Sequence, residues 1–233
     1  MRFGVVVFPG SNCDEDAFHA AKDVFGQEAE YLWHKDHDLK GADVVILPGG
    51  FAHGDYLRTG AMARFSPIMN EVRAFAGRGG PVLGICNGFQ ILQEAGLLPG
   101  AMLRNRTVKF LSVPVHIRVE RDDTVATAGL AVGTVLTMPI AHGEGNFYAE
   151  PAEVQRLEDE GRVVFRYTTR AGALDDAANV NGSVNAIAGV CNRQRNVVGL
   201  MPHPERAAEP ELGSADGRQI LEALVRAMAV VGS

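Results

Sequence analysis

The sequence predicts an α/β fold in which a doubly wound, mostly parallel sheet is flanked by helices. Short apolar runs of strand length alternate with helix-like segments, an order that favours parallel strands joined by helical crossovers. Turn signals rich in glycine and proline follow several of these runs, where a strand would end. No internal repeat or low-complexity linker divides the 233 residues, so we expect one domain over residues 1–233.

The first strand and helix are expected at the N-terminus. Arg2 to Phe8 is a continuous apolar run that predicts a buried strand. Pro9 to Asn12 would then supply a turn and an N-cap for a helix that runs to about Phe25 and ends at Gly26. The apolar run is far too short for a membrane span, and it lacks the cleavage site of a signal peptide.

Three more strands and two helices should complete the parallel part. The strands are expected at Ala29 to Trp33, Val44 to Leu47 and Pro81 to Ile85, and the helices at Met62 to Arg78, broken near Pro67, and at Asn87 to Ala95. Ligands of such sheets bind beyond the carboxyl ends of the strands. Two features lie at such ends: the Gly49-Gly50 turn and Cys86.

The middle of the chain predicts an antiparallel or mixed extension of the sheet. Strand-like runs occur at Val115 to Val119, Val135 to Ile140 and Val163 to Tyr167, with a helix near Pro151 to Glu160. Two later strands, Val184 to Val190 and Asn196 to Met201, precede an amphipathic helix over Asp216 to Val230.

Composition excludes several classes of function. A formal net charge of −6 without a basic run argues against nucleic-acid binding. The three cysteines lack CxxC spacing, which disfavours a disulfide framework or a thiolate zinc site and suggests a reducing cytoplasm. No glycine pattern matches a Walker or dinucleotide fingerprint, so we expect no nucleotide cofactor in this chain. We also expect no metal, because no P-C-x-x-C motif occurs and the isolated histidines lack metal-ligand spacing.

A candidate nucleophile lies in the sequence Gly84-Ile85-Cys86-Asn87-Gly88. This is G-x-C-x-G between a strand and a helix, the thiol counterpart of the nucleophile elbow. The positive end of the following helix favours the thiolate. The Asn87 N–H, with a second donor from Gly49 or Gly50, would form an oxyanion hole. The other two cysteines, Cys13 and Cys191, are better explained as small buried hydrophobes.

The general base should be a histidine supported by a carboxylate, and the sequence contains His-x-Glu twice. His203 and Glu205 follow a predicted strand, and the flanking prolines favour extended backbone that directs both side chains to one side. His142 and Glu144 lie among glycines in what we expect to be a mobile loop, which suits contact with substrate or partner better than rigid catalysis. The first pair is therefore favoured, and the second is kept as the alternative.

These motifs together resemble those of class I (triad) glutamine amidotransferases. The elbow of that family, G-x-C-x-G-x-Q, matches residues 84–90 and includes Gln90. The resemblance is closer to the glutaminase-subunit family of phosphoribosylformylglycinamidine synthases, through segments 9–14, 48–51, 53–56, 142–147 and 201–206. It implies a triad of Cys86, His203 and Glu205, a glutamyl thioester intermediate, and a role for Gln90 in holding glutamine.

The resemblance also implies partners. Ammonia from glutamine would pass to a large synthetase subunit that carries ATP and Mg²⁺ and makes formylglycinamidine ribonucleotide in purine biosynthesis, and a third small subunit would join the complex. Two other interpretations remain open. One is a stand-alone cysteine hydrolase or glutaminase of the same fold, which would act at full rate without partners. The other is a scaffold subunit, for which an intact triad would be unnecessary.

Overall fold

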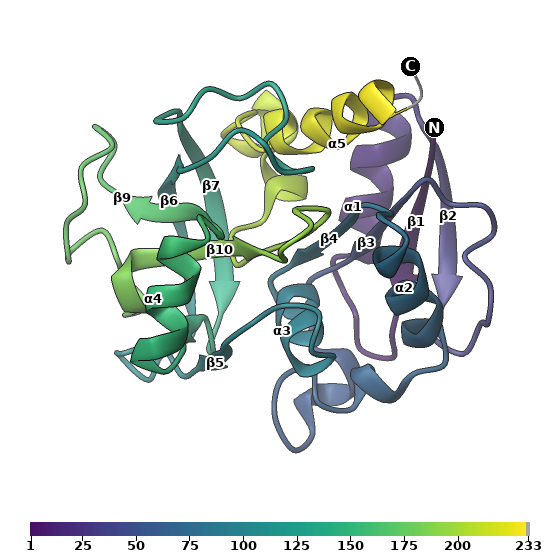
Figure 1. Ribbon diagram of the computed structural model, residues 1–233, viewed down its shortest axis with the longest axis horizontal. Helices are drawn as coiled ribbons and strands as arrows, with labels where there is room; N and C mark the ends of the chain where they lie inside the picture. Colours follow the sequence, from purple (N-terminus) through teal and green to yellow (C-terminus); the bar gives the residue numbers. More distant parts are fainter. Residues whose placement is uncertain (232–233) are drawn as a thin grey trace.

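The computed structural model describes the backbone of residues 1–231 and the side chains of residues 1–228. Its main feature is a nine-stranded sheet in the order β2-β1-β3-β4-β11-β10-β9-β6-β7. The strands are β1 (Arg2–Val7), β2 (Glu28–Trp33), β3 (Val44–Leu47), β4 (Val82–Ile85), β6 (Leu111–Val119), β7 (Val135–His142), β9 (Val163–Thr168), β10 (Ile187–Cys191) and β11 (Val197–Leu200). Figure 1 shows β1–β4 on one side of the molecule and β6, β7 and β9 on the other.

The sheet is parallel in one half and antiparallel in the other. Strands β2, β1, β3, β4 and β11 pair in parallel, whereas β11, β10, β9, β6 and β7 pair antiparallel. Every residue of β3, β4 and β11 is buried, as expected for parallel strands covered on both faces. The predicted α/β class with an antiparallel extension is thus confirmed.

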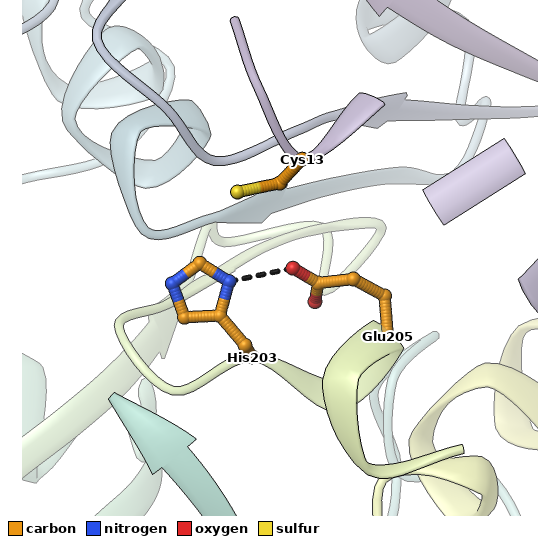
Figure 2. Close-up of side chains that lie close together, drawn as sticks. All are labelled: Cys13, His203 and Glu205. Carbon is orange, nitrogen blue, oxygen red and sulfur yellow. Dashed lines mark hydrogen bonds and ion pairs between the residues drawn. The ribbon is translucent and has the colours of Figure 1, made fainter. Parts of the chain in front are cut away.

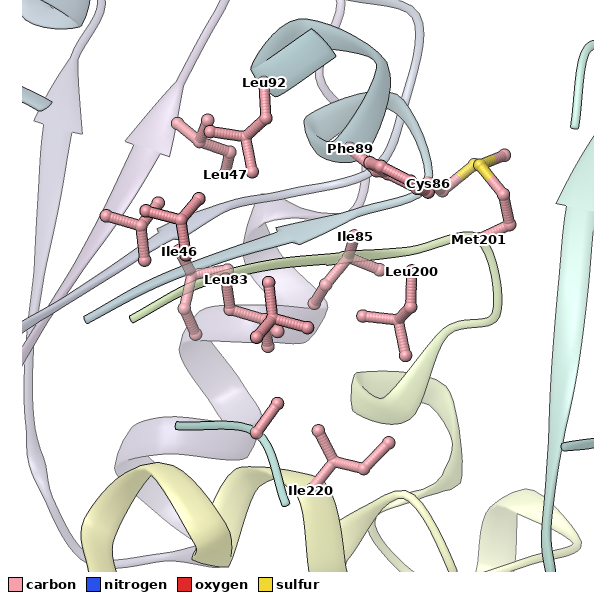
Figure 3. Close-up of a cluster of buried hydrophobic side chains, with 14 of the residues drawn as sticks. Ile46, Leu47, Leu83, Ile85, Cys86, Phe89, Leu92, Leu200, Met201 and Ile220 are labelled. Atoms are coloured by element: carbon pink, nitrogen blue, oxygen red, sulfur yellow. The ribbon is translucent and has the colours of Figure 1, made fainter. Parts of the chain in front are cut away.

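Helices cover both faces of the parallel half. The α-helices are α1 (Asp14–His19, continued by a π-helical turn over Ala20–Val24), α2 (Ile68–Gly77), α3 (Asn87–Glu94), α4 (Pro151–Asp159) and α5 (Arg218–Val231). Figure 3 shows Phe89 and Leu92 of α3 on one face of the strands and Ile220 of α5 on the other. This packing fixes the start of α3 against the end of β4, where Cys86 lies.

The remaining elements are short. Five 3₁₀ turns lie at Ala52–Asp55, Ala63–Phe65, Val184–Ala186, Pro204–Ala207 and Pro210–Leu212, and a separate two-stranded sheet joins β5 (Ala101–Leu103) to β8 (Asn146–Tyr148). Among residues 1–231, no helix is long and apolar enough to cross a membrane.

Several predicted boundaries differ from the structure. The first helix begins at Asp14, so Cys13 rather than Asn12 occupies the N-cap position, without a side-chain cap. The break near Pro67 is as predicted, but the part before it is only a 3₁₀ turn over Ala63–Phe65, and α2 starts at Ile68 with Pro67 as its N-cap residue. The run from Val184 begins as a 3₁₀ turn, since Asn185 adopts a left-handed φ of 49°. The strands β5 and β8 were not predicted, because three residues carry too little periodicity.

Candidate active site

Cys86 lies on a strained turn between β4 and α3. Its φ of 49° and ψ of −106° are unusual for any residue other than glycine. The elbow glycines make the turn possible. A Cβ on Gly84 would lie 2.8 Å from the backbone of Gly88, and a Cβ on Gly88 would lie 1.9 Å from the carbonyl oxygen of Leu47. The predicted elbow is therefore present, and it holds the thiol at the carboxyl end of the sheet.

The Gly49-Gly50 turn lies beside Cys86 because β3 and β4 are parallel neighbours whose ends coincide, with Leu47 opposite Gly84. A Cβ on Gly49 would lie 2.7 Å from Cε1 of His203 and 3.4 Å from Cβ of Cys86. Gly49 thus marks the point where the elbow and His203 converge, and a side chain would not fit there. Gly50 has a φ of 133°, which also favours glycine.

His203 and Glu205 form a buried hydrogen-bonded pair. Nδ1 of His203 lies 2.5 Å from Oε1 of Glu205, and both side chains are fully buried (Figure 2). The backbone of His203 is extended, and its N–H donates to the carbonyl of Pro139 on β7. Glu205 lies in the 3₁₀ turn Pro204–Ala207 rather than on extended backbone. The two side chains meet as predicted, but through a turn.

The charges around His203 favour its protonated form. Burial by itself would lower its pKa, but the Glu205 carboxylate, and then the negative charge of a Cys86 thiolate, raise the pKa well above the usual value. Within the described residues, Nε2 of His203 has no hydrogen-bond partner. One ring nitrogen is thus held by a carboxylate, and the other is available to exchange a proton with a neighbouring thiol.

Cys13 also belongs to this cluster, although the sequence suggested an inert thiol. Its Sγ lies 3.1 Å from the position of a Cβ on Gly49 and accepts a hydrogen bond from Nη2 of Arg206 at 3.0 Å. Arg206 also donates to Asp16 on α1 at 2.9 Å. The N-cap position of α1 brings Cys13 here, and no sequence motif indicated that contact.

Cys13, His203 and Glu205 have the composition of a metal site, because one ligand atom from each lies within 4.8 Å of the others. Figure 2 shows that Nδ1 of His203 points at Glu205 rather than at a position shared with Cys13. The Cys13 sulfur is further engaged by the cationic Arg206. The cluster therefore has the contacts of a hydrogen-bonded network. Cys191, by contrast, is fully buried at the end of β10, and burial raises its pKa to about 11.

Cys86 opens into a cavity of about 150 Å³. Its lining residues are Gly50, Phe51, Asp55, Thr59, Cys86, Gln90, Phe110, Ala141, His142, Gly143 and Glu144. Pockets for drug-sized ligands usually measure about 300–1,000 Å³, so this one suits a small metabolite. A larger cavity of about 810 Å³ lies elsewhere, lined by arginines and acids such as Arg118 and Glu120, which pair at 2.7 Å. It contains no nucleophilic thiol among its lining residues.

Asn87 and Gln90 connect the elbow to the cavity walls. The Asn87 side chain accepts from the N–H of Ala52 at 3.0 Å and donates to Gln90 Oε1 at 2.9 Å and to Asp55 Oδ1 at 3.3 Å. Gln90 donates in turn to the carbonyl oxygen of Glu144 at 2.6 Å. Gln90 thus lines the cavity as the sequence suggested, but its amide is already engaged with protein groups.

The segment from His142 to Gly145 is held in place, which corrects the expectation of a mobile loop. Asn105 is the main anchor: its Nδ2 donates to the carbonyl of His142 at 2.8 Å, and its Oδ1 accepts from the N–H of Gly145 at 3.1 Å. Asn181 donates to the carbonyl of Gly145 at 2.7 Å. No sequence signal indicated Asn105 or Asn181, because their partners are backbone groups distant in sequence.

His142 has a different environment from His203. Its Nδ1 lies 3.0 Å from the amide oxygen of Asn105, with no carboxylate behind it. Burial, with a smaller effect from His203, lowers its pKa to about 4. The ring is therefore neutral at physiological pH and a weaker base than His203. This difference in basicity favours His203 over His142 as the general base.

Known proteins resemble this chain along nearly all of its length. A family model described as a CobB/CobQ-like glutamine amidotransferase domain matches residues 1–220. The phosphoribosylformylglycinamidine synthase subunit PurQ of Koribacter versatilis is 56% identical, over 98% of this chain and 99% of that protein. The same subunit of Rubrobacter xylanophilus is 60% identical, over 97% of this chain and 98% of that protein.

Solved structures of glutamine amidotransferases have a similar fold. A chain in the structure of PurLQS from Thermotoga maritima superposes with a TM-score of 0.85 at 42% identity, covering 97% of this chain and 98% of that one. A glutamine amidotransferase from Thermotoga maritima, at 19% identity and a TM-score of 0.54, shares the fold over 99% of this chain and 92% of its own length.

Proposed function

Since the chain belongs to the PurQ subunits of phosphoribosylformylglycinamidine synthase, within the glutamine amidotransferases, we propose that Cys86, His203 and Glu205 release ammonia from glutamine for a partner subunit. The observation that carries this assignment is the joint placement of a strained cysteine elbow and a buried His-Glu pair. Both meet at Gly49, beside a cavity of metabolite size.

The reaction follows the chemistry of an activated thiol. Nε2 of His203 takes the Cys86 proton, and the thiolate attacks the carboxamide carbon of glutamine. The tetrahedral intermediate collapses as the C–N bond breaks, and ammonia leaves with a proton from His203. Water, deprotonated by His203, then attacks the thioester and releases glutamate. Glu205 orients the imidazole and stabilises its charge throughout.

The oxyanion would be held by backbone donors at the elbow. Asn87 is the first residue of α3, and N–H groups in the first turn of a helix have no partner within the helix. Gly50 lines the cavity from the neighbouring strand end, and Gly49 lies against both catalytic side chains. We assign the donor roles to Asn87 and Gly50, with Gly49 providing the clearance they need.

Gln90 acts on glutamine through the cavity wall. Its hydrogen bonds to Asn87 and to the Glu144 carbonyl fix the wall that faces Cys86. The Gln90 side chain would also contact the bound glutamine. Loss of this amide should therefore raise KM more than it lowers kcat.

The ammonia acceptor is a large synthetase subunit, joined by a third small subunit; ATP and Mg²⁺ belong to the large subunit. One support is the apolar rim, defined as the exposed side chains of Phe51, Tyr56, Leu57 and Phe110. Phe51 and Phe110 line the cavity, and Tyr56 and Leu57 follow its lining residue Asp55. Tyr56 is 75% and Leu57 84% exposed, which is costly unless a partner covers them. Three free, buried cysteines agree with a reducing cytoplasm.

The test is ammonia release from glutamine by the wild type and by Cys86→Ala, each with and without both partner subunits and their nucleotides. Cys86-dependent release that rises with partners is expected. Full activity of the isolated chain would instead support a stand-alone hydrolase. Activity that survives the substitution would exclude this triad, and absence of a trapped glutamyl adduct would exclude the thioester.

A further inference from the structure

Two carboxylates line the cavity in front of Cys86, and they come from separate segments. Asp55 lies in the 3₁₀ turn after β3, and Glu144 lies in the segment between β7 and β8. The cavity lining includes no lysine or arginine among the described residues. The nearest cation to Glu144 is Arg104, at 4.0 Å with a side chain 74% exposed, so solvent weakens that pair.

This arrangement is unfavourable in the empty protein. Burial, followed by the nearby charge of Glu144, raises the pKa of Asp55 to about 6. Within the described residues, its carboxylate accepts only one long hydrogen bond, of 3.3 Å, from the neutral amide of Asn87. Two acids that repel each other in a half-buried cavity indicate that something cationic normally lies between them.

A third acceptor on the cavity wall, Nε2 of His142, also lacks a donor to pair with. Oδ1 of Asn105 accepts from the N–H of Gly145, so Nδ1 of His142 must carry the hydrogen that it shares with that oxygen. Nε2 is then a bare acceptor. His142 is 4% exposed and lines the cavity, yet Nε2 has no partner among the described residues. A neutral imidazole of this kind can accept a hydrogen bond but cannot donate one from Nε2.

The backbone around Asp55 is also strained. His53, Asp55 and Leu57 have φ values of 55°, 54° and 71°, in the left-handed region that non-glycine residues rarely adopt. Such conformations are unfavourable for residues with a side chain, and they concentrate at functional sites. Here they place the Asp55 side chain in the cavity wall while its neighbours Tyr56 and Leu57 are exposed.

We propose that Asp55 and Glu144 bind the α-ammonium group of glutamine, with Nε2 of His142 as a further acceptor on the same wall. The inference rests on the proposed function, because it assumes that the carboxamide of the substrate is at Cys86. An ammonium carries three N–H donors and a full positive charge. It relieves the repulsion between the two acids, which have only the long contacts from Asn87, Thr59 and Arg104. It also gives a donor to Nε2 of His142, which has no partner among the described residues.

The subsite makes Asp55 and Glu144 determinants of specificity. Amides that lack an α-amino group can still reach Cys86, but they leave the two acids unneutralised. Discrimination by buried polar groups that lose their partner is strong. Glutamine should therefore be preferred over its desamino analogue, 4-carbamoylbutanoate, by the interactions that these side chains supply.

The experiment compares kcat/KM for glutamine and for 4-carbamoylbutanoate in the assembled complex. The variants are Asp55→Asn and Glu144→Gln, which keep the size of the side chain; asparagine also tolerates the left-handed backbone at position 55. Asp159→Asn is the matched control, because Asp159 is an exposed residue of α4 whose side chain contacts Gln155. If turnover of the analogue is too slow, its Ki against glutamine hydrolysis gives the same comparison.

In the wild type and in Asp159→Asn, glutamine should be preferred. In Asp55→Asn and Glu144→Gln, the preference should fall about 10–100-fold, mainly through KM for glutamine, as expected for losing a hydrogen bond to a charged group. Equal losses for both substrates, or an unchanged preference, would overturn the subsite. Failure of the wild type to release ammonia from glutamine would instead overturn the proposed function, so the two failures are distinguishable.

Discussion

A Cβ on Gly88 would lie 1.9 Å from the carbonyl oxygen of Leu47, closer than any two such atoms can approach. The start of α3 therefore rests directly on the end of β3. Because this contact sets where Cys86 faces the cavity, the elbow depends on a missing side chain as much as on the thiol.

Gly88→Ala should consequently displace α3 from the sheet. We expect a loss of about 1–3 kcal/mol or more in the free energy of unfolding, as for other overpacked sites, together with most of the activity. Gly77→Ala is the control: it lies in α2, a Cβ there meets nothing within 4 Å, and its φ is not positive. That variant should be neutral or stabilised by up to about 1 kcal/mol. Equal effects in urea unfolding would contradict the role of the Leu47 contact.

Glu205→Gln should remove the charge that holds His203 while keeping the shape of the side chain. We expect kcat to fall about 10²–10⁴-fold, by analogy with other triads that lose the carboxylate. The control is Glu209→Gln, because Glu209 also pairs with a histidine, His19, at 2.9 Å, but at the surface. Ammonia release by that variant should match the wild type, and similar losses in both would exclude a specific role for Glu205.

The same pair predicts how stability depends on pH. The folded pKa of His203 is raised above its ordinary value of 6.5. Its protonated form therefore stabilises the fold fully below pH 6.5, and this contribution disappears as the pH rises through the folded pKa. In Glu205→Gln this part of the pH dependence should be reduced. Thermal unfolding between pH 6 and 9, with wild type and variant in parallel, measures the difference.

The three cysteines should react unequally with a small electrophile. Burial raises the pKa of Cys13, and it raises that of Cys191 to about 11, so both thiols stay protonated near neutral pH. Cys86 lines the cavity, and His203 is its base in the proposed triad. Brief treatment with a glutamine-like chloroketone should label one cysteine per chain, at Cys86, as read by peptide mass spectrometry. Labelling of Cys13 to a comparable extent would contradict this selectivity.

The sequence was sufficient to predict the parallel half of the fold and the elbow. Val44 to Leu47 and Asn87 onward carry strong local signals, an apolar run before a glycine turn and a helix directly after a G-x-C-x-G motif. The His203–Glu205 pair was also predicted, because i, i+2 spacing restricts where two side chains can meet. Each of these predictions rests on residues close together in the chain.

The rest of the site depends on contacts between distant segments. Cys13 meets Arg206 across 193 positions, and Asn105 meets His142 across 37. Neither contact has a local pattern. In the sequence, Asp55 stands out only as part of a segment that resembles the family, since a single acid in a turn is ordinary at a surface. Its importance arises from Glu144 on the opposite segment, a proximity that the fold alone creates.

Asn105→Ala should show what anchors the His142 segment. The substitution removes donors to the carbonyls of Lys109 and His142 and an acceptor for Gly145 and His142, all partly or fully buried. Leaving such groups unpaired costs about 1–3 kcal/mol each. We expect lower stability and a raised KM for glutamine, because Glu144 belongs to this segment. Asn192→Ala, which breaks a partly buried turn contact to Asn196 far from the cavity, should lower stability without raising KM.

Asp55→Asn should instead gain stability while it loses affinity for glutamine. The folded pKa of Asp55 is raised from 3.8 to about 6, so the folded state binds the proton more tightly than the unfolded chain does. Stability therefore falls as the pH rises from about 4 to 6, and the full penalty persists above pH 6. The shift corresponds to about 3 kcal/mol without screening, and to about 1 kcal/mol for a half-exposed group.

The Asp55→Asn variant should therefore melt about 2–4 °C higher than the wild type at pH 7.5 and no higher at pH 4. A residue kept only for structure would not stabilise the protein when its charge is removed, whereas a binding carboxylate held ready for an ammonium should. A variant that is less stable at pH 7.5 would show that the Asp55 charge supports the fold rather than the substrate.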